Sequence, residues 1–506
     1  MIAKNSVIGY RTGMQKKLNF VFFMPDSLRA DVLACYGHPL VQTPNYDRLA
    51  REGTLFEQSI CQYPVCGPSR CSMITGLYPH NTACRNNQYF IQASQGNLFT
   101  SLKQAGYHVE WHGKNDMFAP DVFPQAVSRC NQRPQVLEDR PSYDVHQAER
   151  IVPAGEPGGR SHLCNSLGTV EDFGDTHRVN SAISWLENRK QGAKPFALYL
   201  PLEMPHSPFT APEPYYAMYD PDDLPPLRPY DLPNKPKRLA LLRKYFELDQ
   251  MPDDMLRKIN AVYLGMVSYT DMLLGRLLDS LEAQGLMDST VVVALSDHGE
   301  YAGDFGMVTK TAGSHEDLLN RVPFIWRGPG ITAGHRVEAP VELFDLMATT
   351  LDLCKVPCTH PHFARVLTPQ LKGAAGDPDR AVFCEGGLGA VNRHLCGPGT
   401  LEGGILEDPD NFYYPPYKCI FDHPEVDART VSVQTLTHKL VHRPEDESEL
   451  YDLRIDPQEL CNRFNDPEMA AIQQKLMQRL TDWLIETSDI TPDTVFPRQG
   501  PKKVWD

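Results

Sequence analysis

Four short polar turns each follow a run of apolar residues, and they hold many of the side chains suited to chemistry. They are residues 25–27 (PDS), 113–116 (GKND), 204–206 (MPH) and 297–300 (DHGE). Carboxylates bind hard metal ions, histidine moves protons near neutral pH, and lysine holds anions. In open α/β sheets, functional residues gather beyond the carboxyl ends of the strands. Four such turns therefore indicate a common functional edge of a predicted sheet.

The most specific motif is CGPSRCSMITG, at residues 66–76. Its C-x-P-S-R-x-x-x-x-T-G pattern resembles the signature of the type I sulfatases, in which the cysteine is oxidised after translation to the aldehyde formylglycine. The resemblance extends through TPNYDRLAREG (43–53), SDHGE (296–300) and ELYDLRIDPQE (449–459), and so covers nearly the whole chain. It implies an alkaline phosphatase-like fold and makes Cys66 the modified nucleophile rather than a buried thiol.

A hydrated aldehyde carries two hydroxyl groups on one carbon, which explains the chemistry of such a residue. One hydroxyl attacks sulfur and expels the alcohol. The second then loses its proton and expels sulfate, so breakdown needs no attack of water on sulfur. The resemblance implies that Arg70 holds the hydrate by charge-assisted hydrogen bonds. The residues after Cys66 are expected to open a helix whose N-terminus faces the anionic substrate.

The same resemblance implies a metal site. Asp26, Asp297 and His298 match the metal positions of the family, and the formylglycine oxygen made from Cys66 completes the set of protein ligands. Hard oxygen ligands favour Ca²⁺, with Mg²⁺ or Mn²⁺ as alternatives. The metal lowers the pKa of the hydrate, which is otherwise a poor nucleophile near neutral pH.

Three further residues match positions that handle the sulfate and the leaving group. The resemblance implies that Lys114 and Lys310 bind sulfate oxygens and neutralise developing charge. His206, in the string PHSPF, matches the histidine near the leaving group and is expected to act as general acid toward the departing alcohol.

The chain departs from the family pattern at two places. Many members have two acidic residues, or Asp-Gln, after the first strand, whereas this chain has Asp26 followed by Ser27. Many members also have a histidine two or three residues after the lysine, where this chain has Asn115, Asp116 and Met117. Asp116 is a candidate to accept a proton from the hydrate in place of that histidine.

The leading hypothesis is a sulfatase that cleaves a sulfate monoester, with a small or oligosaccharide sulfate ester as substrate and a sulfated carbohydrate preferred. The alternatives are a phosphonate monoester or phosphodiester hydrolase of the same superfamily and a non-catalytic glycan-binding relative. The resemblance also implies a formylglycine-generating maturation enzyme as a partner. A net charge of −15 excludes broad attraction to nucleic acid or anionic membranes.

The elements that must position these residues alternate along the chain, which predicts an α/β fold with a mainly parallel central sheet flanked by helices. Continuous apolar runs predict strands covered on both faces at residues 18–24, 107–113, 195–201, 289–296 and 322–328. Helical patterns lie at residues 46–52, 98–104, 170–189 and 255–283.

A change of pattern near residue 376 predicts two domains, a catalytic domain over residues 14–375 and a smaller C-terminal α+β subdomain over residues 376–506. In the second, short antiparallel strands are expected at residues 429–433, 438–441 and 449–453, and a helix at residues 469–486. Two loop-rich segments, residues 202–237 and 384–430, are expected to shape the outer pocket.

The N-terminal residues show no secretory pattern and no apolar stretch approaches membrane-spanning length. The 13 cysteines have no metal-ligand spacing, so most are expected to be reduced thiols. We therefore expect a cytoplasmic protein, with a periplasmic location as the alternative if a native leader was removed.

Overall fold

The computed structural model describes residues 17–131, 148–153, 155–190, 192–389 and 403–489. The predicted domain start at residue 14 and part of the loop-rich segment 384–430 lie outside the described residues. Within them, no helix is long and apolar enough to cross a membrane.

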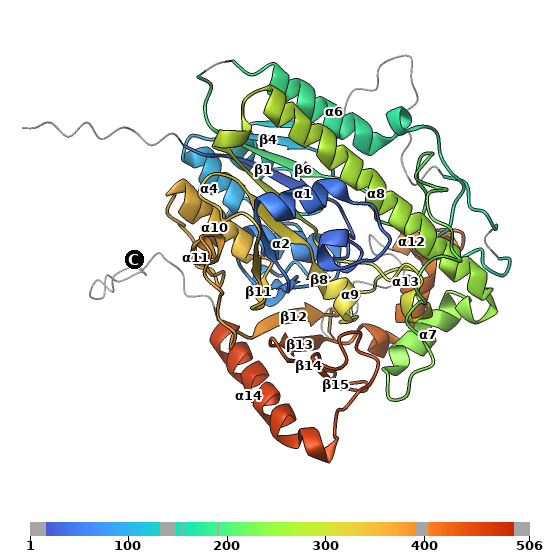
Figure 1. Ribbon diagram of the computed structural model, residues 1–506. Helices are drawn as coiled ribbons and strands as arrows, with labels where there is room; N and C mark the ends of the chain where they lie inside the picture. The colour runs from blue at the N-terminus through green and yellow to red at the C-terminus, as the bar shows by residue number, and fades with distance from the viewer. Residues whose placement is uncertain (1–16, 132–147, 154, 191, 390–402, 490–506) are drawn as a thin grey trace, which may run out of the picture.

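An eight-stranded sheet forms the centre of the molecule (Figure 1). Its strand order is β10 (His335–Val337), β2 (Thr54–Phe56), β9 (Phe324–Arg327), β7 (Thr290–Leu295), β1 (Asn19–Met24), β6 (Phe196–Pro201), β4 (His108–His112), β5 (Arg129–Asn131). The run from β7 through β1, β6 and β4 to β5 is parallel throughout. This order places the carboxyl ends of β7, β1, β6 and β4 side by side at one edge.

Helices cover both faces of this sheet, and the alternation of side chains along β1 shows why its sequence is apolar throughout. Val21 and Phe23 belong to the core formed with α1 (Pro44–Glu52), α6 (Gly174–Glu187) and α8 (Asp253–Ala283). Phe20 and Phe22 point to the other core, formed with α2 (Cys66–Thr75), α4 (Leu98–Gln104) and α10 (Asp345–Cys354). A strand with helices on both sides has no face left for polar residues.

The mainly parallel α/β fold is confirmed, with one correction. The apolar run at residues 322–328 was expected to behave like the other buried parallel strands. It instead contains β9, which pairs antiparallel with both β7 and β2. Burial on both faces produces the same apolar pattern whichever way a strand runs, so the pattern does not encode direction. The first residue of the apolar run 322–328 belongs to β8 (Arg321–Val322). This strand lies in a small sheet with β3 (Ser59–Ile60) and β11 (Val341–Glu342).

The remaining helices are shorter or lie toward the C-terminus. They are α3 (Pro79–Thr82), α5 (Phe123–Ala126), α7 (Lys237–Tyr245), α9 (Asp317–Asn320), α11 (Thr368–Leu371), α12 (Gly403–Glu407), α13 (Tyr414–Asp422) and α14 (Ala470–Thr487).

A four-stranded antiparallel sheet follows the central domain, in the order β12 (Val382–Gly386), β13 (Thr430–Gln434), β14 (His438–His442), β15 (Glu449–Asp452). Leu476, Leu480 and Trp483 of α14 join the same core as Phe20 and Phe22 of β1. The C-terminal antiparallel sheet is therefore present as predicted, with the additional strand β12, and its core is continuous with that of the larger sheet.

Buried polar contacts also tie this sheet to the segment between Gly313 and Asp317. Lys439 of β14 pairs with Glu459 at 2.7 Å and donates to the backbone oxygen of His315. The other carboxylate oxygen of Glu459 accepts a hydrogen bond from the backbone nitrogen of Asp317 at 2.9 Å. The contacts hold a loop that begins three residues after Lys310.

Replacing Lys439 by Met is expected to destabilise the protein strongly. Both side chains of the Lys439–Glu459 pair are 1% exposed, so the variant leaves an unpaired buried carboxylate. Such a change costs about 3–5 kcal/mol of unfolding free energy. The matched control is Lys418→Met, which removes an i,i+4 pair with Asp422 whose side chains are 35% and 31% exposed, and it should cost less than about 1 kcal/mol. Urea unfolding curves measure both. Equal losses would show that the buried pair contributes no more than a surface pair.

Candidate active site

The four polar turns of the sequence meet at one edge of the central sheet. Residues 25–27 follow β1, residues 113–116 follow β4, residues 204–206 lie beyond β6, and residues 297–300 lie beyond β7. Because these four strands are adjacent and parallel, their following loops converge.

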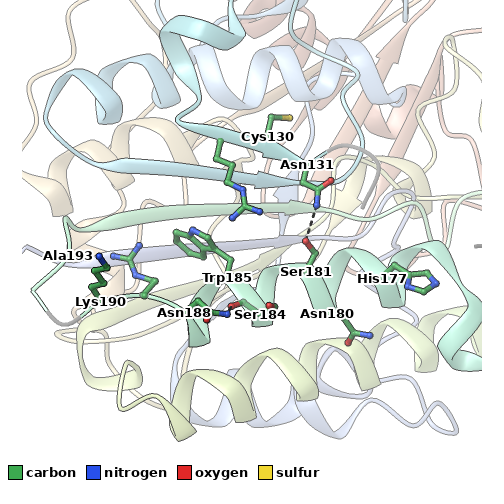
Figure 2. A pocket seen from close by; sticks show the side chains of 12 residues that line it. Cys130, Asn131, His177, Asn180, Ser181, Ser184, Trp185, Asn188, Lys190 and Ala193 are labelled. Carbon is green, nitrogen blue, oxygen red and sulfur yellow. Dashed lines mark hydrogen bonds between the residues drawn. The ribbon is translucent and has the colours of Figure 1, made fainter. Parts of the chain in front are cut away.

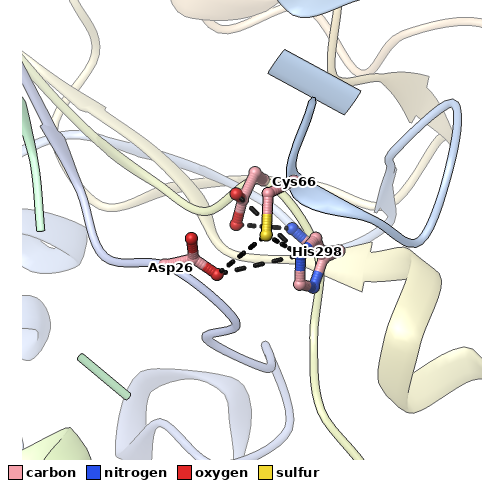
Figure 3. Close-up of side chains that lie close together, drawn as sticks. Asp26, Cys66 and His298 are labelled. Atoms are coloured by element: carbon pink, nitrogen blue, oxygen red, sulfur yellow. Dashed lines mark hydrogen bonds and ion pairs between the residues drawn. The ribbon is translucent and has the colours of Figure 1, made fainter. Parts of the chain in front are cut away.

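A buried cluster of metal-ligand types lies where the turns converge (Figure 3). Asp26, Cys66, Asp297 and His298 each offer one ligand atom, and these atoms all lie within 4.8 Å of one another. Cys66 Sγ is 3.2 Å from His298 Nε2 and 3.5 Å from Asp26 Oδ1. The residues that the sequence separates by up to 272 positions therefore form one group.

Cys66 is positioned by the start of a helix. α2 begins at Cys66, as expected from the motif, and the backbone nitrogen of Gly67 donates to Asn87 Oδ1 at 2.9 Å. Ser69 Oγ donates to the backbone oxygen of Asp297 at 2.6 Å, which ties the helix directly to the β7 turn. The serine and glycine of the motif thus fix the place of the cysteine.

The β7 turn requires its glycine. A Cβ atom at Gly299 would lie 1.8 Å from the backbone oxygen of Leu318, so no other residue fits. The imidazole Nδ1 of His298 lies 2.8 Å from the backbone oxygen of Gly299. A carbonyl oxygen only accepts, so Nδ1 donates this hydrogen bond and Nε2 is the nitrogen that faces the cluster.

Arg70 joins the two carboxylates of the cluster. Its side chain is fully buried, with Nε 2.7 Å from Asp297 Oδ2 and one terminal nitrogen 2.6 Å from Asp26 Oδ2. The other terminal nitrogen is buried and has no hydrogen-bond partner among the described residues. The guanidinium therefore holds the two candidate metal ligands in place. Any contact of its remaining terminal nitrogen with a bound substrate comes in addition to this.

Lys114 provides the second cation beside the cluster. Its ammonium lies 2.8 Å from Asp26 Oδ2, 3.0 Å from Asp116 Oδ2 and 3.9 Å from Cys66 Sγ. Burial opposes the charge of Asp26, but Lys114 and Arg70 outweigh it and hold the pKa of Asp26 well below its usual value. The Asp26 carboxylate is therefore ready to act as a ligand near neutral pH.

Lys310 reaches the site through Ser27. Its ammonium lies 3.5 Å from Ser27 Oγ, which in turn donates to Asp26 Oδ1 at 2.9 Å. The backbone nitrogen of Ser27 donates to Asp297 Oδ1 at 3.2 Å. Ser27 thus connects a lysine to the two carboxylates.

His206 is a buried neutral imidazole. Its Nδ1 contacts the backbone oxygen of Ser207, so Nδ1 carries the proton and Nε2 is an acceptor. Burial, and after it the charge of Lys310, lowers the pKa of His206 well below its ordinary value. The charges of Asp26 and Lys114 also act on it, which places His206 beside the cluster.

Three residues of the site had no assigned role in the sequence. Glu300 accepts from the backbone nitrogen of Lys310 at 2.6 Å and from Thr309 Oγ1 at 3.1 Å, and it lies in the SDHGE string. Asn87 caps the first turn of α2 from a loop without a recognisable pattern. Tyr413 experiences the charges of both site lysines from the C-terminal unit, and no spacing singles it out among the 21 tyrosines.

A cavity of about 970 Å³ lies elsewhere, between β5 and α6 (Figure 2). Asn131 and Ser181 on its wall share a hydrogen bond of 2.9 Å. Trp185, also on the wall, already packs against His108 and Arg189. None of the cluster residues lines this cavity.

The cluster fits a divalent cation by its donors. Two carboxylates and an imidazole nitrogen face one point beside Cys66. The described side chains there include the cations Arg70, Lys114 and Lys310 and the carboxylates Asp26, Asp116, Asp297 and Glu300. Carboxylate oxygens and an imidazole nitrogen that converge in a buried site form a donor set suited to a divalent cation.

Comparison with known proteins identifies the family of the chain. The family model described as Sulfatase matches residues 18–356, and the one described as N-sulphoglucosamine sulphohydrolase, C-terminal, matches residues 405–486. The chain is 26% identical over 513 residues to the multifunctional alkaline phosphatase superfamily protein PehA of Trinickia caryophylli, covering 93% of this chain and 94% of that protein. It is 31% identical over 350 residues to iduronate 2-sulfatase of Homo sapiens, covering 65% and 62%.

A solved structure shares the fold. The phosphonate monoester hydrolase of Agrobacterium radiobacter superposes with a TM-score of 0.74 at 24% identity, over 93% of this chain and 96% of that one. The cluster at the strand ends and the cysteine motif at the start of α2 agree with the family match, which covers more than half of the residues. The chain therefore belongs to the sulfatase family of sulfuric ester hydrolases.

Proposed function

We propose that the protein is a formylglycine-dependent sulfatase that hydrolyses a sulfate monoester of a carbohydrate. The observation that carries the proposal is the position of Cys66, at the buried start of α2 with the ligand atoms of Asp26, Asp297 and His298 within 4.8 Å. Two lysines border the same point.

The environment of Cys66 disfavours chemistry by the unmodified thiol. Burial, and after it the charge of Asp26, raises the pKa of the Cys66 thiol far above its ordinary value, despite the two nearby lysines. A buried protonated thiol is a poor nucleophile. The aldehyde hydrate made from Cys66 would instead supply the attacking oxygen, as in the family that the motif resembles.

Asp26, Asp297 and His298 would hold the divalent metal, with Ca²⁺ the expected ion and Mg²⁺ or Mn²⁺ the alternatives. The ion would supply positive charge that favours an ionised nucleophile. Arg70 fixes the two carboxylates, since its guanidinium contacts both at 2.6 and 2.7 Å. Its role is therefore to keep these ligands in place, while its remaining terminal nitrogen lies 3.9 Å from Asp116 Oδ2.

Lys114 and Lys310 would bind the sulfuryl oxygens beside Cys66. Burial works against the charge on each ammonium, but neighbouring carboxylates raise the pKa of both above the ordinary value. Both lysines therefore stay charged, and preorganised cations of this kind stabilise the negative charge that grows during bond cleavage.

His206 would donate a proton to the leaving alcohol. In the structure its Nδ1 proton is used by Ser207, so the transferable proton must be on Nε2 of the imidazolium form. Because the pKa of His206 lies well below its ordinary value, this form becomes populated only as the pH falls. An incoming anion beside the imidazole favours the same form.

A carbohydrate is the proposed alcohol because of the named relatives. The C-terminal residues match the model of an N-sulphoglucosamine sulphohydrolase, and iduronate 2-sulfatase is among the similar proteins. The second candidate is hydrolysis of phosphonate monoesters or phosphodiesters. It is favoured by two similar proteins, the multifunctional alkaline phosphatase superfamily protein PehA and the phosphonate monoester hydrolase of Agrobacterium radiobacter, each matched over 93% of this chain.

Cys66→Ala should abolish turnover and leave the fold intact, because the replaced group is small and α2 keeps its other contacts. The assay compares activity toward a nitrophenyl sulfate, a phosphonate monoester and a phosphodiester. In the unsubstituted protein, mass spectrometry first checks residue 66 for the aldehyde. Preference for the sulfate supports the sulfatase, and preference for either phosphorus ester selects the second candidate. Normal activity of Cys66→Ala would remove the proposed nucleophile.

Asp297→Asn should lower the affinity for the divalent metal by at least roughly 10–100-fold, since it removes a charged ligand while keeping the shape of the side chain. Calorimetric titration of metal-free protein with Ca²⁺, Mg²⁺ and Mn²⁺ measures this loss and identifies the preferred ion. Asp121→Asn, which removes an exposed carboxylate at the end of the β4 loop, is the matched control. Unchanged affinity in Asp297→Asn would mean that the metal is held elsewhere.

The ratio of activity on an alkyl or sugar sulfate to activity on a nitrophenyl sulfate should rise as the pH falls. Only the poor leaving group needs a proton. The population of the imidazolium form of His206 increases as the pH falls toward the lowered pKa of this residue. His206→Ala should flatten this ratio across the pH range and should slow the alkyl ester more than the aryl ester. Equal losses on both esters would instead assign His206 to binding or structure.

A further inference from the structure

Asp116 has a fixed place beside the nucleophile. Its carboxylate lies 3.0 Å from Lys114 Nζ and 3.9 Å from the terminal nitrogen of Arg70 that lacks a hydrogen bond. The turn that carries it is held by Asn115, whose side chain accepts from the backbone nitrogen of Phe118 at 3.0 Å and donates to its backbone oxygen at 2.9 Å. The carboxylate is therefore a built part of the site.

Asp116 also lies on the accessible side of the cluster. The side chains of Asp26, Arg70 and Asp297 are 0% exposed, whereas those of Lys114 and Asp116 are 22% and 19% exposed. Lys114 Nζ is 3.9 Å from Cys66 Sγ. A ligand that reaches Cys66 from solvent along Lys114 thus brings its anionic group close to the Asp116 carboxylate.

The presence of this carboxylate changes which anions the site favours. Lys114 is already shared between Asp26 and Asp116, at 2.8 and 3.0 Å, so its charge is largely balanced before a ligand arrives. Each further negative charge on the ligand gains less from Lys114 and is repelled by Asp116. Selectivity can be built from such a repulsive element as well as from attraction.

We propose that Asp116 is a charge-selectivity residue that admits monoanionic esters and disfavours dianions; this inference rests on the proposed function. A sulfate monoester carries one negative charge, whereas a phosphate monoester carries nearly two at neutral pH. The Asp116 carboxylate therefore rejects phosphate monoesters and accepts sulfate monoesters, and phosphodiesters equally.

The same residue assists product release. Hydrolysis of a monoanionic sulfate ester with one water yields the alcohol, one proton and inorganic sulfate, which is a dianion. The product thus carries one more negative charge than the substrate. Asp116 weakens binding of the product relative to the substrate, and this limits inhibition by sulfate.

The test uses two probes that differ by one charge, methyl sulfate and inorganic sulfate. Their dissociation constants are measured by calorimetry on metal-loaded Cys66→Ala protein at constant ionic strength, with and without Asp116→Asn. The amide keeps the size of the side chain and removes its charge. We expect Asp116→Asn to tighten sulfate relative to methyl sulfate by roughly 10–100-fold, the size of one charge interaction in a partly buried site.

Two control variants separate charge from structure. Asp116→Glu keeps the carboxylate and should keep the selectivity of the parent protein. Asp121→Asn removes an exposed carboxylate from the same loop and should leave both constants unchanged. In protein with intact Cys66, Asp116→Asn should raise the activity ratio of nitrophenyl phosphate to nitrophenyl sulfate and lower the inhibition constant of sulfate.

The outcomes distinguish this inference from the proposed function. An unchanged ratio of the two dissociation constants in folded Asp116→Asn overturns the inference, as does a failure of both anions to bind. A shifted ratio in a protein that cleaves no sulfate ester supports the inference and overturns the proposed function. Sulfatase activity with an unchanged ratio leaves the proposed function standing alone.

Discussion

The site depends on the contacts of the Arg70 guanidinium, which reaches the carboxylate of Asp26 with one nitrogen and that of Asp297 with another. The two carboxylates come from turns that are 271 residues apart, and all three side chains are fully buried. Two buried carboxylates repel each other and lose hydration, so they remain ionised only with compensating charge. A fixed guanidinium fork provides that charge from α2, the helix that also begins with Cys66. One residue of the motif thus sets the distance between nucleophile and metal ligands.

The sequence predicted the layers of the fold well because burial on both sides dictates composition. The strands β1, β4, β6 and β7 and the helix α8 lie within a few residues of their predicted positions. The direction of β9 and the pairing of the short strands were not predictable, since both depend on contacts between distant segments. The proposed division into domains near residue 376 stays a prediction.

The site shows the same division between local and distant information. Cys66, Asp297 and His298 stand in strings whose spacing limits their chemistry, and the structure brings them together with Asp26. The contact of Lys114 with Asp26, by contrast, joins the turn after β4 to the turn after β1, which no string encodes. Tyr413 belongs to this second group, since it acts on both site lysines through a fold that joins separate segments.

The C-terminal antiparallel sheet is more than an addition to the central sheet. Lys439 and Glu459 hold the segment from Gly313 to Asp317 by buried contacts, and Arg443 donates to the backbone oxygen of Gly313 at 2.6 Å. Lys310 lies three residues before this segment, and its own backbone is fixed only by Glu300 among the contacts described above. A loop that must keep an ammonium beside Asp26 needs support at both ends, because misplacing a charged group by about 1 Å loses much of its effect on the reacting atoms. The antiparallel sheet supplies that support from the far side, which couples the folding of the smaller unit to the geometry of the site.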